Sequence, residues 1–475
     1  MFGTSGIRGE VGKQVTAQLA FDVGRALASE GYDKVLVGRD ARESGTVLAD
    51  AVSAGLRDCG ADAVRAGVVT TPTLARSVWQ VDGDAGVMVT ASHNPPKDNG
   101  LKLWDITSQA FDGQKRVSVA DRLENQDFES VRSQELGEEI PAPDLAENHR
   151  NALTAAIDLD GDSGDDLSVV VDAGNSPGIL TADVLRDLGC SVTTLNGEFD
   201  GRLSGRPSEP TAENCRGLRA IVAESDADFG VAHDGDADRM MAVTESGEFV
   251  SGDVLLALFG RRYAEEGTKV AAPLNTSLAV DDALRSVGAS LTRTKVGDGY
   301  VAERLQDSGV VFGGEPSGAW IWPDEAFCPD GPLAACRLAE IVSERGSLDD
   351  LVADIETYPT KRTSVRTDEK RERMQMVAET LREEYDDVDT RDGIRVEVDG
   401  GWFLVRASGT QPLVRVTAEA ETDERATELF DRAVELVERA DDPNYNRQEG
   451  GRQKDGGQTS GSRDRMGIST SVNGP

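Results

Sequence analysis

Long hydrophobic runs are missing from this sequence of 475 residues. No apolar stretch approaches the ~20 residues that a helix needs to span a bilayer. The N-terminal residues, from Met1 to Gly9, contain neither the basic n-region nor the apolar h-region of a signal peptide. The five cysteines are odd in number and form no C-x-x-C pair, which is typical of reduced, structural thiols. These absences predict a cytoplasmic protein that does not associate with membranes.

Positive charge is also scarce. The 86 acidic residues outnumber the 50 basic ones, and the net charge is −36. A nucleic-acid-binding protein needs a basic surface, so this composition argues against that class. Charge repulsion between molecules keeps such an acidic protein soluble, but repulsion within the molecule destabilises its compact state at low salt. Molar salt screens that repulsion, and we therefore expect adaptation to molar salt. The alternative, a solvated acidic interaction protein, fits poorly with the many strand-forming segments.

Apolar residues are concentrated in short runs that alternate with amphipathic stretches as far as about residue 355. This alternation predicts parallel sheets covered by helices. From about Thr363 a helix, three strands and a second helix predict a small α+β domain, and the polar chain after Asp442 is predicted to be disordered. The runs expected as strands in the first part are 35–37, 86–89, 169–171, 229–232 and 310–312.

The first candidate loop is the hexapeptide Thr90-Ala91-Ser92-His93-Asn94-Pro95, which follows the apolar run 85–89. In open α/β sheets, reacting groups tend to be displayed just past such strands. Taken alone, a serine and a histidine in a polar turn are more often structural than catalytic. The loops described next favour the catalytic interpretation.

The second loop, from His233 to Arg239, carries three aspartates at alternate positions directly after a predicted strand. Carboxylates that converge on one point suit Mg²⁺, which prefers hard oxygen ligands. The loop is not an EF-hand, and the plain alternative is an acidic surface loop. Two of the three histidines of the chain, His93 and His233, lie in these two loops, whereas His149 is predicted on the surface.

Two further loops contain groups that suit a phosphosugar. The segment 313–318, Gly-Gly-Glu-Pro-Ser-Gly, lets a ligand approach the backbone closely, and Glu315 and Ser317 offer hydrogen bonds to sugar hydroxyls. The segment 406–412, with Arg415 after it, combines guanidinium groups, hydroxyls and a glycine turn, which suit a phosphate dianion. Each segment alone is also compatible with an ordinary turn. Together the four loops supply the parts that phosphoryl transfer to a sugar needs.

The order of these motifs resembles the α-D-phosphohexomutase family, which includes phosphoglucomutases, phosphomannomutases and phosphoglucosamine mutases, over about residues 1 to 440. The N-terminal segment Gly3-Thr4-Ser5-Gly6-Ile7-Arg8-Gly9 belongs to the match. The sequence departs from the family at Ala319, where many members have histidine, at Gln411, where glutamate is usual, and at Ala407, where proline is frequent. These departures concern substrate choice and remove no essential charge.

The resemblance implies an α/β fold of four domains around a central cleft. Three are similar α/β domains with mixed sheets, and the last is a smaller α+β domain. The implied boundaries are residues 1–149 with the serine loop, 150–248 with the metal loop, 249–360 with the sugar loop and 361–440 with the phosphate loop, followed by a disordered tail at 441–475.

The resemblance also implies roles for individual residues. Ser92 would carry a phosphoryl group, and one Mg²⁺ per subunit would be held by Ser92, Asp234, Asp236 and Asp238. Arg8 and Arg239 would neutralise charge on the phosphoryl oxygens, and Lys102 and His93 are candidates for proton transfer. A sugar 1,6-bisphosphate would act as intermediate and activator. The residues expected to bind substrate are Glu315, Ser317, Arg406, Ser408, Gly409, Thr410 and Arg415.

The predicted function is therefore transfer of a phosphoryl group between the 1- and 6-positions of a hexose phosphate. Glucosamine phosphate is slightly preferred over mannose or glucose phosphate, and a pentose phosphate on the same scaffold is an alternative. A non-catalytic sugar-phosphate-binding protein is the alternative of another class, although neither Ser92 nor a metal aspartate is lost. The expected partner is the small-molecule sugar phosphate, without nucleic acid or membrane, and the chain is expected to be a monomer or a homodimer.

Overall fold

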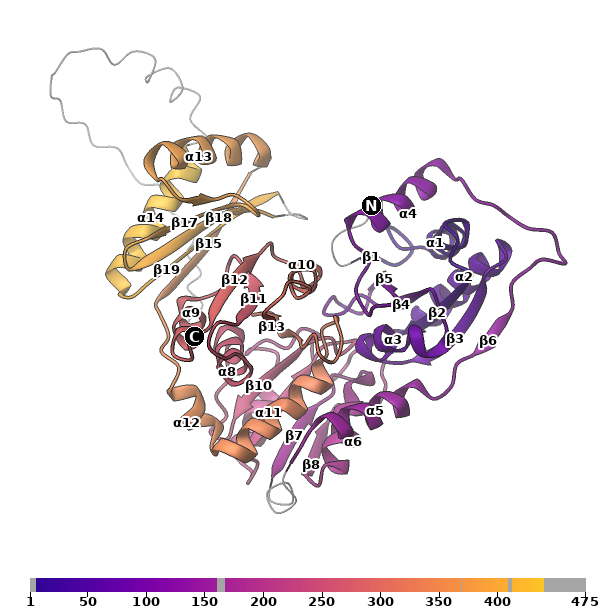
Figure 1. Ribbon diagram of the computed structural model, residues 1–475, viewed down its shortest axis with the longest axis horizontal. Coiled ribbons are helices and arrows are strands. Elements are labelled where there is room, and N and C mark those ends of the chain that lie inside the picture. Colours follow the sequence, from indigo (N-terminus) through magenta and orange to yellow (C-terminus); the bar gives the residue numbers. More distant parts are fainter. Residues whose placement is uncertain (1–5, 160–166, 368, 409–411, 440–475) are drawn as a thin grey trace, which may run out of the picture. The chain divides into compact units, whose positions relative to one another are not determined.

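The structure is a computed structural model that describes residues 6–159, 167–367, 369–408 and 412–439. The chain divides into two compact units, Met1–Glu356 and Thr357–Pro475. The first unit contains three sheets and the second contains one (Figure 1). Within the described ranges, no helix combines the length and the apolar character needed to cross a membrane.

The first sheet has six strands in the order β1-β5-β4-β2-β3-β6. The central strands β4, β2 and β3 are parallel, whereas β5 pairs antiparallel with β4 and with β1. The strands are β1 Ile7–Glu10, β2 Lys34–Arg39, β3 Asp62–Val68, β4 Ala85–Val89, β5 Asp98–Asp105 and β6 Glu139–Pro141. The helices of this region are α1 Ala17–Ser29, α2 Gly45–Asp58, α3 Thr71–Ser77, α4 Gly113–Asn125 and α5 Leu145–Ala156, with a short 3₁₀ turn at Trp79–Val81.

The second and third sheets each have four strands, in the orders β10-β9-β7-β8 and β12-β11-β13-β14. The strands are β7 Ser168–Asp172, β8 Ser191–Leu195, β9 Phe229–His233, β10 Met240–Thr244, β11 Lys269–Pro273, β12 Ser290–Thr294, β13 Val310–Glu315 and β14 Ala319–Ile321. The helices are α6 Leu180–Asp187, α7 Arg216–Ala223, α8 Gly252–Tyr263, α9 Leu278–Arg285, α10 Asp298–Arg304, α11 Gly331–Arg345 and α12 Leu348–Ala353, with a 3₁₀ turn at Pro177–Ile179.

One feature is common to the three sheets of the first unit. Each contains a parallel set of three neighbouring strands, β4-β2-β3, β9-β7-β8 and β13-β11-β12, to which β6 adds a fourth in the first sheet. In each set the first-named strand is followed in sequence by a strand that pairs with it antiparallel. These antiparallel pairs are β4–β5, β9–β10 and β13–β14. Their connecting loops contain the serine motif, the aspartate motif and the sugar motif, so the three motifs occupy equivalent positions in three similar sheets.

The apolar runs of the sequence form these sheets as predicted. Strands β4 and β9 are buried along their whole length, as expected for strands covered on both faces. Helices α1 and α2 pack so closely that a Cβ atom on Gly55 would lie 1.9 Å from the carbonyl oxygen of Phe21. The glycine is therefore required by the close approach of the two helices.

The second unit, as described, is an antiparallel five-stranded sheet with two helices. This agrees with the predicted α+β class, but the sequence predicted only three of the five strands and missed β15 and β16. Its strand order is β15-β19-β18-β17-β16. Apolar side chains of the sheet pack against both helices in one core. The elements are β15 Thr360–Arg366, α13 Lys370–Glu384, β16 Val388–Asp389, β17 Ile394–Val398, β18 Gly401–Ala407, β19 Leu413–Ala420 and α14 Asp423–Arg439. The predicted tail at 441–475 lies outside the described residues.

Candidate active site

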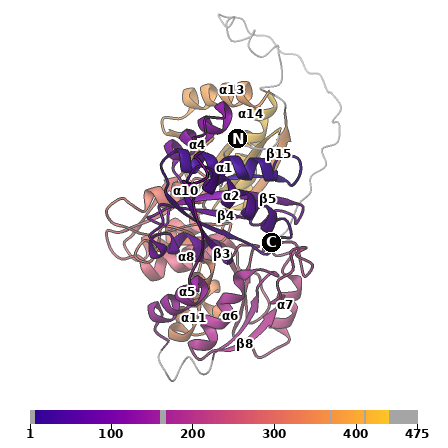
Figure 2. The same ribbon diagram turned by 90° about the vertical axis from the view of Figure 1, so that its right-hand side faces the viewer.

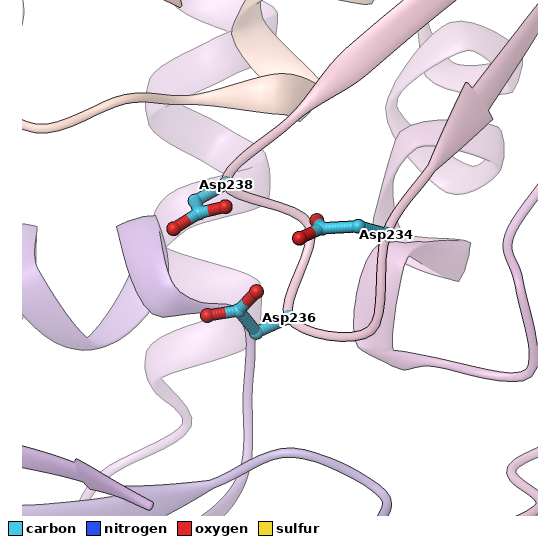
Figure 3. A group of neighbouring side chains, drawn as sticks. All are labelled: Asp234, Asp236 and Asp238. Carbon is cyan, nitrogen blue, oxygen red and sulfur yellow. The ribbon is translucent and has the colours of Figure 1, made fainter. Parts of the chain in front are cut away.

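Three aspartates of the β9–β10 loop turn their carboxylates toward one point (Figure 3). One oxygen from each of Asp234, Asp236 and Asp238 lies within 4.8 Å of the other two, and all three side chains are buried. The tight turn requires a left-handed backbone at Ala237, with φ of 54°. A Cβ atom on Gly235 would lie 2.7 Å from the carbonyl oxygen of Ser92, so the loop also needs glycine there.

This cluster fits a divalent cation. The Oδ1 atoms of Asp236 and Asp238 are buried and have no hydrogen-bond partner, which is costly unless another group binds them. Burial and repulsion by the other two carboxylates raise the pKa of Asp234. The raised pKa indicates that the protein side chains alone supply too little positive charge to balance three buried carboxylates. Lys102 supplies part of it, with Nζ 2.8 Å from Asp236 Oδ2 and in contact with Asp238. An all-oxygen donor set of this kind suits Mg²⁺.

Ser92 points into the same cluster from the β4–β5 loop. Its Oγ donates a hydrogen bond to Asp234 Oδ2 at 2.5 Å, and the residue is 1% exposed. The backbone at Ser92 is left-handed, with φ of 52°, which is strained for a residue with a Cβ atom. The backbone N–H of Ser92 donates to the Thr90 hydroxyl, and its carbonyl accepts a hydrogen bond from Ser208.

Arg42 holds the serine loop in this conformation. Its guanidinium donates to the carbonyls of Ser92 and Asn94, both at 2.7 Å, and to those of Pro95 and Asp98 at 2.7 and 3.0 Å. Its Nε donates to Asp40 at 3.0 Å, and both side chains are at most 1% exposed. The sequence analysis did not identify Arg42. The only sequence signal was its position two residues after Asp40.

Cationic side chains and a histidine surround the serine. The Nε of Arg8 is buried without a hydrogen-bond partner, and the backbone N–H of Arg239 donates to Asp234 Oδ1 at 3.3 Å. His93 Nδ1 lies 3.3 Å from Ser92 Oγ. Burial and the charges of Arg239, Arg8 and Lys102 lower the pKa of His93 to about 2, so the ring is neutral at pH 7. The site therefore combines a hydroxyl with several fixed positive charges.

The sugar motif is joined to the metal loop through the backbone. Met240 N donates to the carbonyl of Gly318 at 2.9 Å, and Arg239 forms an antiparallel bridge with Ala319. Glu315, at the end of β13, accepts a hydrogen bond from Gly297 N at 2.7 Å. Burial, aided by the charge of Asp298, raises the pKa of Glu315 to about 7. Ser317 is exposed and lies 3.4 Å from Glu315.

The predicted phosphate-binding residues that the structure describes, Arg406, Ser408 and Arg415, belong to the second unit. Arg406 on β18 and Arg415 on β19 stand directly opposite each other in the sheet, and Arg406 pairs with Asp392 at 2.9 Å. The carbonyl of Ser408 accepts a hydrogen bond from Lys370 at 2.6 Å. Gly409 and Thr410 lie outside the described residues.

The prediction that His149 is on the surface was wrong. Its side chain is buried and contacts Thr73 and Asp330, which come from distant parts of the sequence. The pattern of helix α5 did not reveal this, because a polar residue on an amphipathic helix is usually solvent-exposed. Sequence reasoning also missed Thr71, whose hydroxyl donates to Asp236 Oδ2 at 2.5 Å.

Profiles described as "Phosphoglucomutase/phosphomannomutase, alpha/beta/alpha domain" I, II and III match residues 1–130, 147–247 and 251–358, and the corresponding C-terminal domain matches residues 363–436. A probable phosphoglucosamine mutase of Methanopyrus kandleri is 46% identical over 92% of this chain and 98% of its own length. A probable phosphoglucosamine mutase of Methanococcoides burtonii is 42% identical over 93% and 99%.

Solved structures show the same similarity. A phosphoglucomutase/phosphomannomutase family protein of Burkholderia thailandensis superimposes with a TM-score of 0.80 at 29% identity, over 92% of this chain and 98% of that one. The N-acetylphosphoglucosamine mutase of Aspergillus fumigatus, solved in complex with GlcNAc-6P and magnesium, has a TM-score of 0.59 at 15% identity, over 93% and 96%. At that identity the likeness shows the fold alone.

Proposed function

The chain belongs to the phosphoglucomutase/phosphomannomutase family of α-D-phosphohexomutases, and from this premise we propose that it interconverts glucosamine 6-phosphate and glucosamine 1-phosphate through a phosphorylated Ser92. It is a phosphosugar mutase, an isomerase that works by phosphotransfer. The proposed role of Ser92 is supported by one observation: its buried hydroxyl donates a hydrogen bond to Asp234, one of the three clustered carboxylates. The names of the archaeal relatives support glucosamine as the sugar.

The proposed reaction moves one phosphoryl group at a time. The free hydroxyl of the sugar phosphate attacks the phosphoserine, so that a new P–O bond forms while the P–O bond to Ser92 breaks. The sugar hydroxyl loses its proton, and the serine oxygen gains one. The bisphosphate then turns over and returns its other phosphoryl group to Ser92. The enzyme thus regains its phosphoserine, and the sugar has changed the position of its phosphate.

The protein side chains contribute charge and proton transfer. A bound Mg²⁺, held by Ser92, Asp234, Asp236 and Asp238, supplies Lewis acidity toward the phosphoryl oxygens. Arg8 and Arg239 neutralise the negative charge that those oxygens carry in the transition state. His93, whose Nδ1 lies 3.3 Å from Ser92 Oγ, and Lys102 are the groups we propose for proton transfer: the neutral imidazole can accept a proton, and the Lys102 ammonium group can donate one.

Substrate recognition is proposed to involve two regions. Glu315 and Ser317 accept and donate hydrogen bonds to the sugar, and the raised pKa of Glu315 lets its carboxyl group act in either role near neutral pH. Arg406, Ser408, Gly409, Thr410 and Arg415 bind the phosphate that does not react. The opposed pair of Arg406 and Arg415 supports this assignment, because two guanidinium groups match a phosphate dianion.

Several finer points are part of the proposal. We propose one Mg²⁺ per subunit, activation by a sugar 1,6-bisphosphate, a monomer or homodimer, and a cytoplasmic location. The matched family segments support the proposed domains 1–149, 150–248, 249–360 and 361–440. Phosphomannomutase or phosphoglucomutase activity is the second candidate, supported by the breadth of the matched family.

A substrate panel tests the function. Purified protein in molar KCl and Mg²⁺ is incubated with the 6-phosphates of glucosamine, mannose and glucose and with ribose 5-phosphate, and the 1-phosphates are followed by ³¹P NMR. We expect the largest kcat/KM with glucosamine 6-phosphate, and no turnover by Ser92→Ala. A higher kcat/KM with mannose or glucose 6-phosphate would make that hexose phosphate the preferred substrate instead. Turnover of ribose 5-phosphate alone would overturn the hexose assignment.

A further inference from the structure

A buried histidine that takes no part in the proposed chemistry lies where three regions of the first unit meet. Helix α5, which carries His149, packs against α3, α6 and α11. Figure 1 and Figure 2 both show α5 beside α6 and α11. The His149 side chain is 3% exposed, so both ring nitrogens must find partners inside the protein.

The two ring nitrogens of His149 bind two different helices. Nδ1 shares a hydrogen bond of 2.8 Å with the hydroxyl of Thr73, in the first turn of α3. Nε2 lies 3.0 Å from Asp330 Oδ2, and Asp330 is the N-cap of α11, where its Oδ1 accepts from Leu333 N. Arg76, in the last turn of α3, reaches the same carboxylate at 3.4 Å, so His149 and Arg76 both link α3 to the beginning of α11, and His149 does so from the first turn of α3.

The beginnings of these two helices bind the backbone of the metal loop. Thr71 N donates to the carbonyl of Asp236 at 2.9 Å, and Gly331 N donates to the carbonyl of the next residue, Ala237, at 3.2 Å. The packing at the second contact is tight, since a Cβ atom on Gly331 would lie 2.7 Å from the Ala237 oxygen. The carbonyls of Asp236 and Ala237 therefore accept hydrogen bonds from the first residues of α3 and α11, the two helices that His149 connects.

We propose that His149 is a positioning residue for cation binding by the metal loop, although it touches none of the three aspartates. By fixing α3 and α11 relative to each other, it keeps the peptide groups of Asp236 and Ala237 in place before the cation arrives. Asp236 and Asp238 then need little rearrangement to bind. The inference rests on the proposed role of this loop as the Mg²⁺ site.

The expected magnitude follows from groups that orient metal ligands elsewhere. Loss of a side chain that orients a ligand typically lowers metal affinity 10- to 100-fold. His149 acts through two helices rather than on the ligand itself, so we expect about a 10-fold increase in the dissociation constant when both of its hydrogen bonds are removed. The effect on kcat at saturating Mg²⁺ is expected to be small, because the bound cation restores the loop.

The test measures Mn²⁺ binding to the unphosphorylated full-length protein by electron paramagnetic resonance, without substrate or turnover. His149→Phe fills the site but forms neither hydrogen bond, and Thr73→Val removes the bond to Nδ1, together with the contact between the Thr73 and Thr70 hydroxyls, while leaving Nε2 with Asp330. Leu153→Val is the matched control, since Leu153 is buried one turn further along α5 and takes part in none of these hydrogen bonds. Asp236→Asn identifies the signal of the metal loop.

We expect the Kd for Mn²⁺ to rise about 10-fold in His149→Phe, less in Thr73→Val, and not at all in Leu153→Val. A corresponding rise in the Mg²⁺ concentration for half-maximal activity, with kcat retained, supports the same conclusion. An unchanged Kd in both folded variants, or an equal rise in Leu153→Val, overturns the inference. If His149→Phe does not fold, Thr73→Val decides alone. Wild-type protein that binds Mn²⁺ but converts no sugar phosphate overturns the proposed function and leaves this inference intact.

Discussion

Replacement of Arg42 by lysine separates the positioning of the serine from the stability of the protein. Lysine keeps the positive charge beside the buried Asp40 but replaces a planar fork by a single ammonium group. The fork donates to four carbonyls, two from each terminal nitrogen. An ammonium group can occupy only one of the two positions, so two of these hydrogen bonds are lost.

The cost in stability is moderate. Two of the four carbonyls have other donors, because Ser92 O also accepts from Ser208 and Pro95 O from the backbone of Asp98. The carbonyls of Asn94 and Asp98 depend on Arg42 among the contacts described, and each is bound by a different nitrogen of the fork. One of them therefore loses its partner, which costs about 1–3 kcal/mol in unfolding free energy, with partial exposure favouring the low end.

The cost in activity is expected to be larger. The left-handed backbone of Ser92 stores about 1–3 kcal/mol of strain, and the loop relaxes when the fork no longer holds its carbonyl. A displacement of the serine oxygen by about 1 Å lowers the transfer rate by about 100-fold. Arg65→Lys is the control, since Arg65 is a partly exposed arginine of the same sheet that pairs with Asp50.

The assay is phosphorylation of Ser92 by a sugar 1,6-bisphosphate, followed by intact-mass analysis as a gain of about 80 Da. Urea unfolding of the same samples gives the stability. We expect Arg42→Lys to be phosphorylated about 100 times more slowly while remaining folded, and Arg65→Lys to match wild type. Phosphorylation of Arg42→Lys at the wild-type rate would refute the role assigned to Arg42.

Three further substitutions test the electrostatics of the site. Burial raises the pKa of Glu315 from 4.5 to about 7, so the folded state loses stability as pH rises through this range. Glu315→Gln should therefore raise the unfolding free energy by up to about 3 kcal/mol at pH 8 and leave it unchanged below pH 4.5. Urea titrations at the two pH values measure this difference. Lys102→Met leaves Asp236 and Asp238 without their cation and should cost about 3–5 kcal/mol in EDTA, with recovery on addition of Mg²⁺. Asp236→Asn should abolish the increase in melting temperature that Mg²⁺ produces in wild type, and a persistent increase would place the cation elsewhere.

The sequence predicted most of what depends on local pattern. The run 229–232 became the buried strand β9, and the strand predicted at 394–398 coincides with β17. The serine, aspartate and sugar motifs were recognisable because each follows such a strand. The equivalence of their three hairpins was not recognisable from the residues, because it depends on how strands that are separated in the sequence pair with one another.

The residues that sequence reasoning missed act across long separations. Arg42 binds carbonyls about fifty residues away in the sequence, and His149 binds Asp330, which lies 181 residues away at the N-cap of α11. Backbone carbonyls carry no sequence signal, so nothing in the segment 92–98 indicates that it needs a guanidinium group. For His149, helical periodicity gives the face of α5 but not the charge of the neighbour that packs against it. Adaptation to molar salt stays a prediction from composition.

The central claim is that Ser92 carries the phosphoryl group that the sugar receives. The most direct measurement incubates enzyme labelled with ³²P at Ser92 with unlabelled glucosamine 6-phosphate in a single turnover with Mg²⁺. The account predicts that the label leaves the protein and appears in glucosamine 1,6-bisphosphate and then in the monophosphates, with none transferred by Ser92→Ala. Label that stays on the protein while glucosamine 1-phosphate is formed would contradict it.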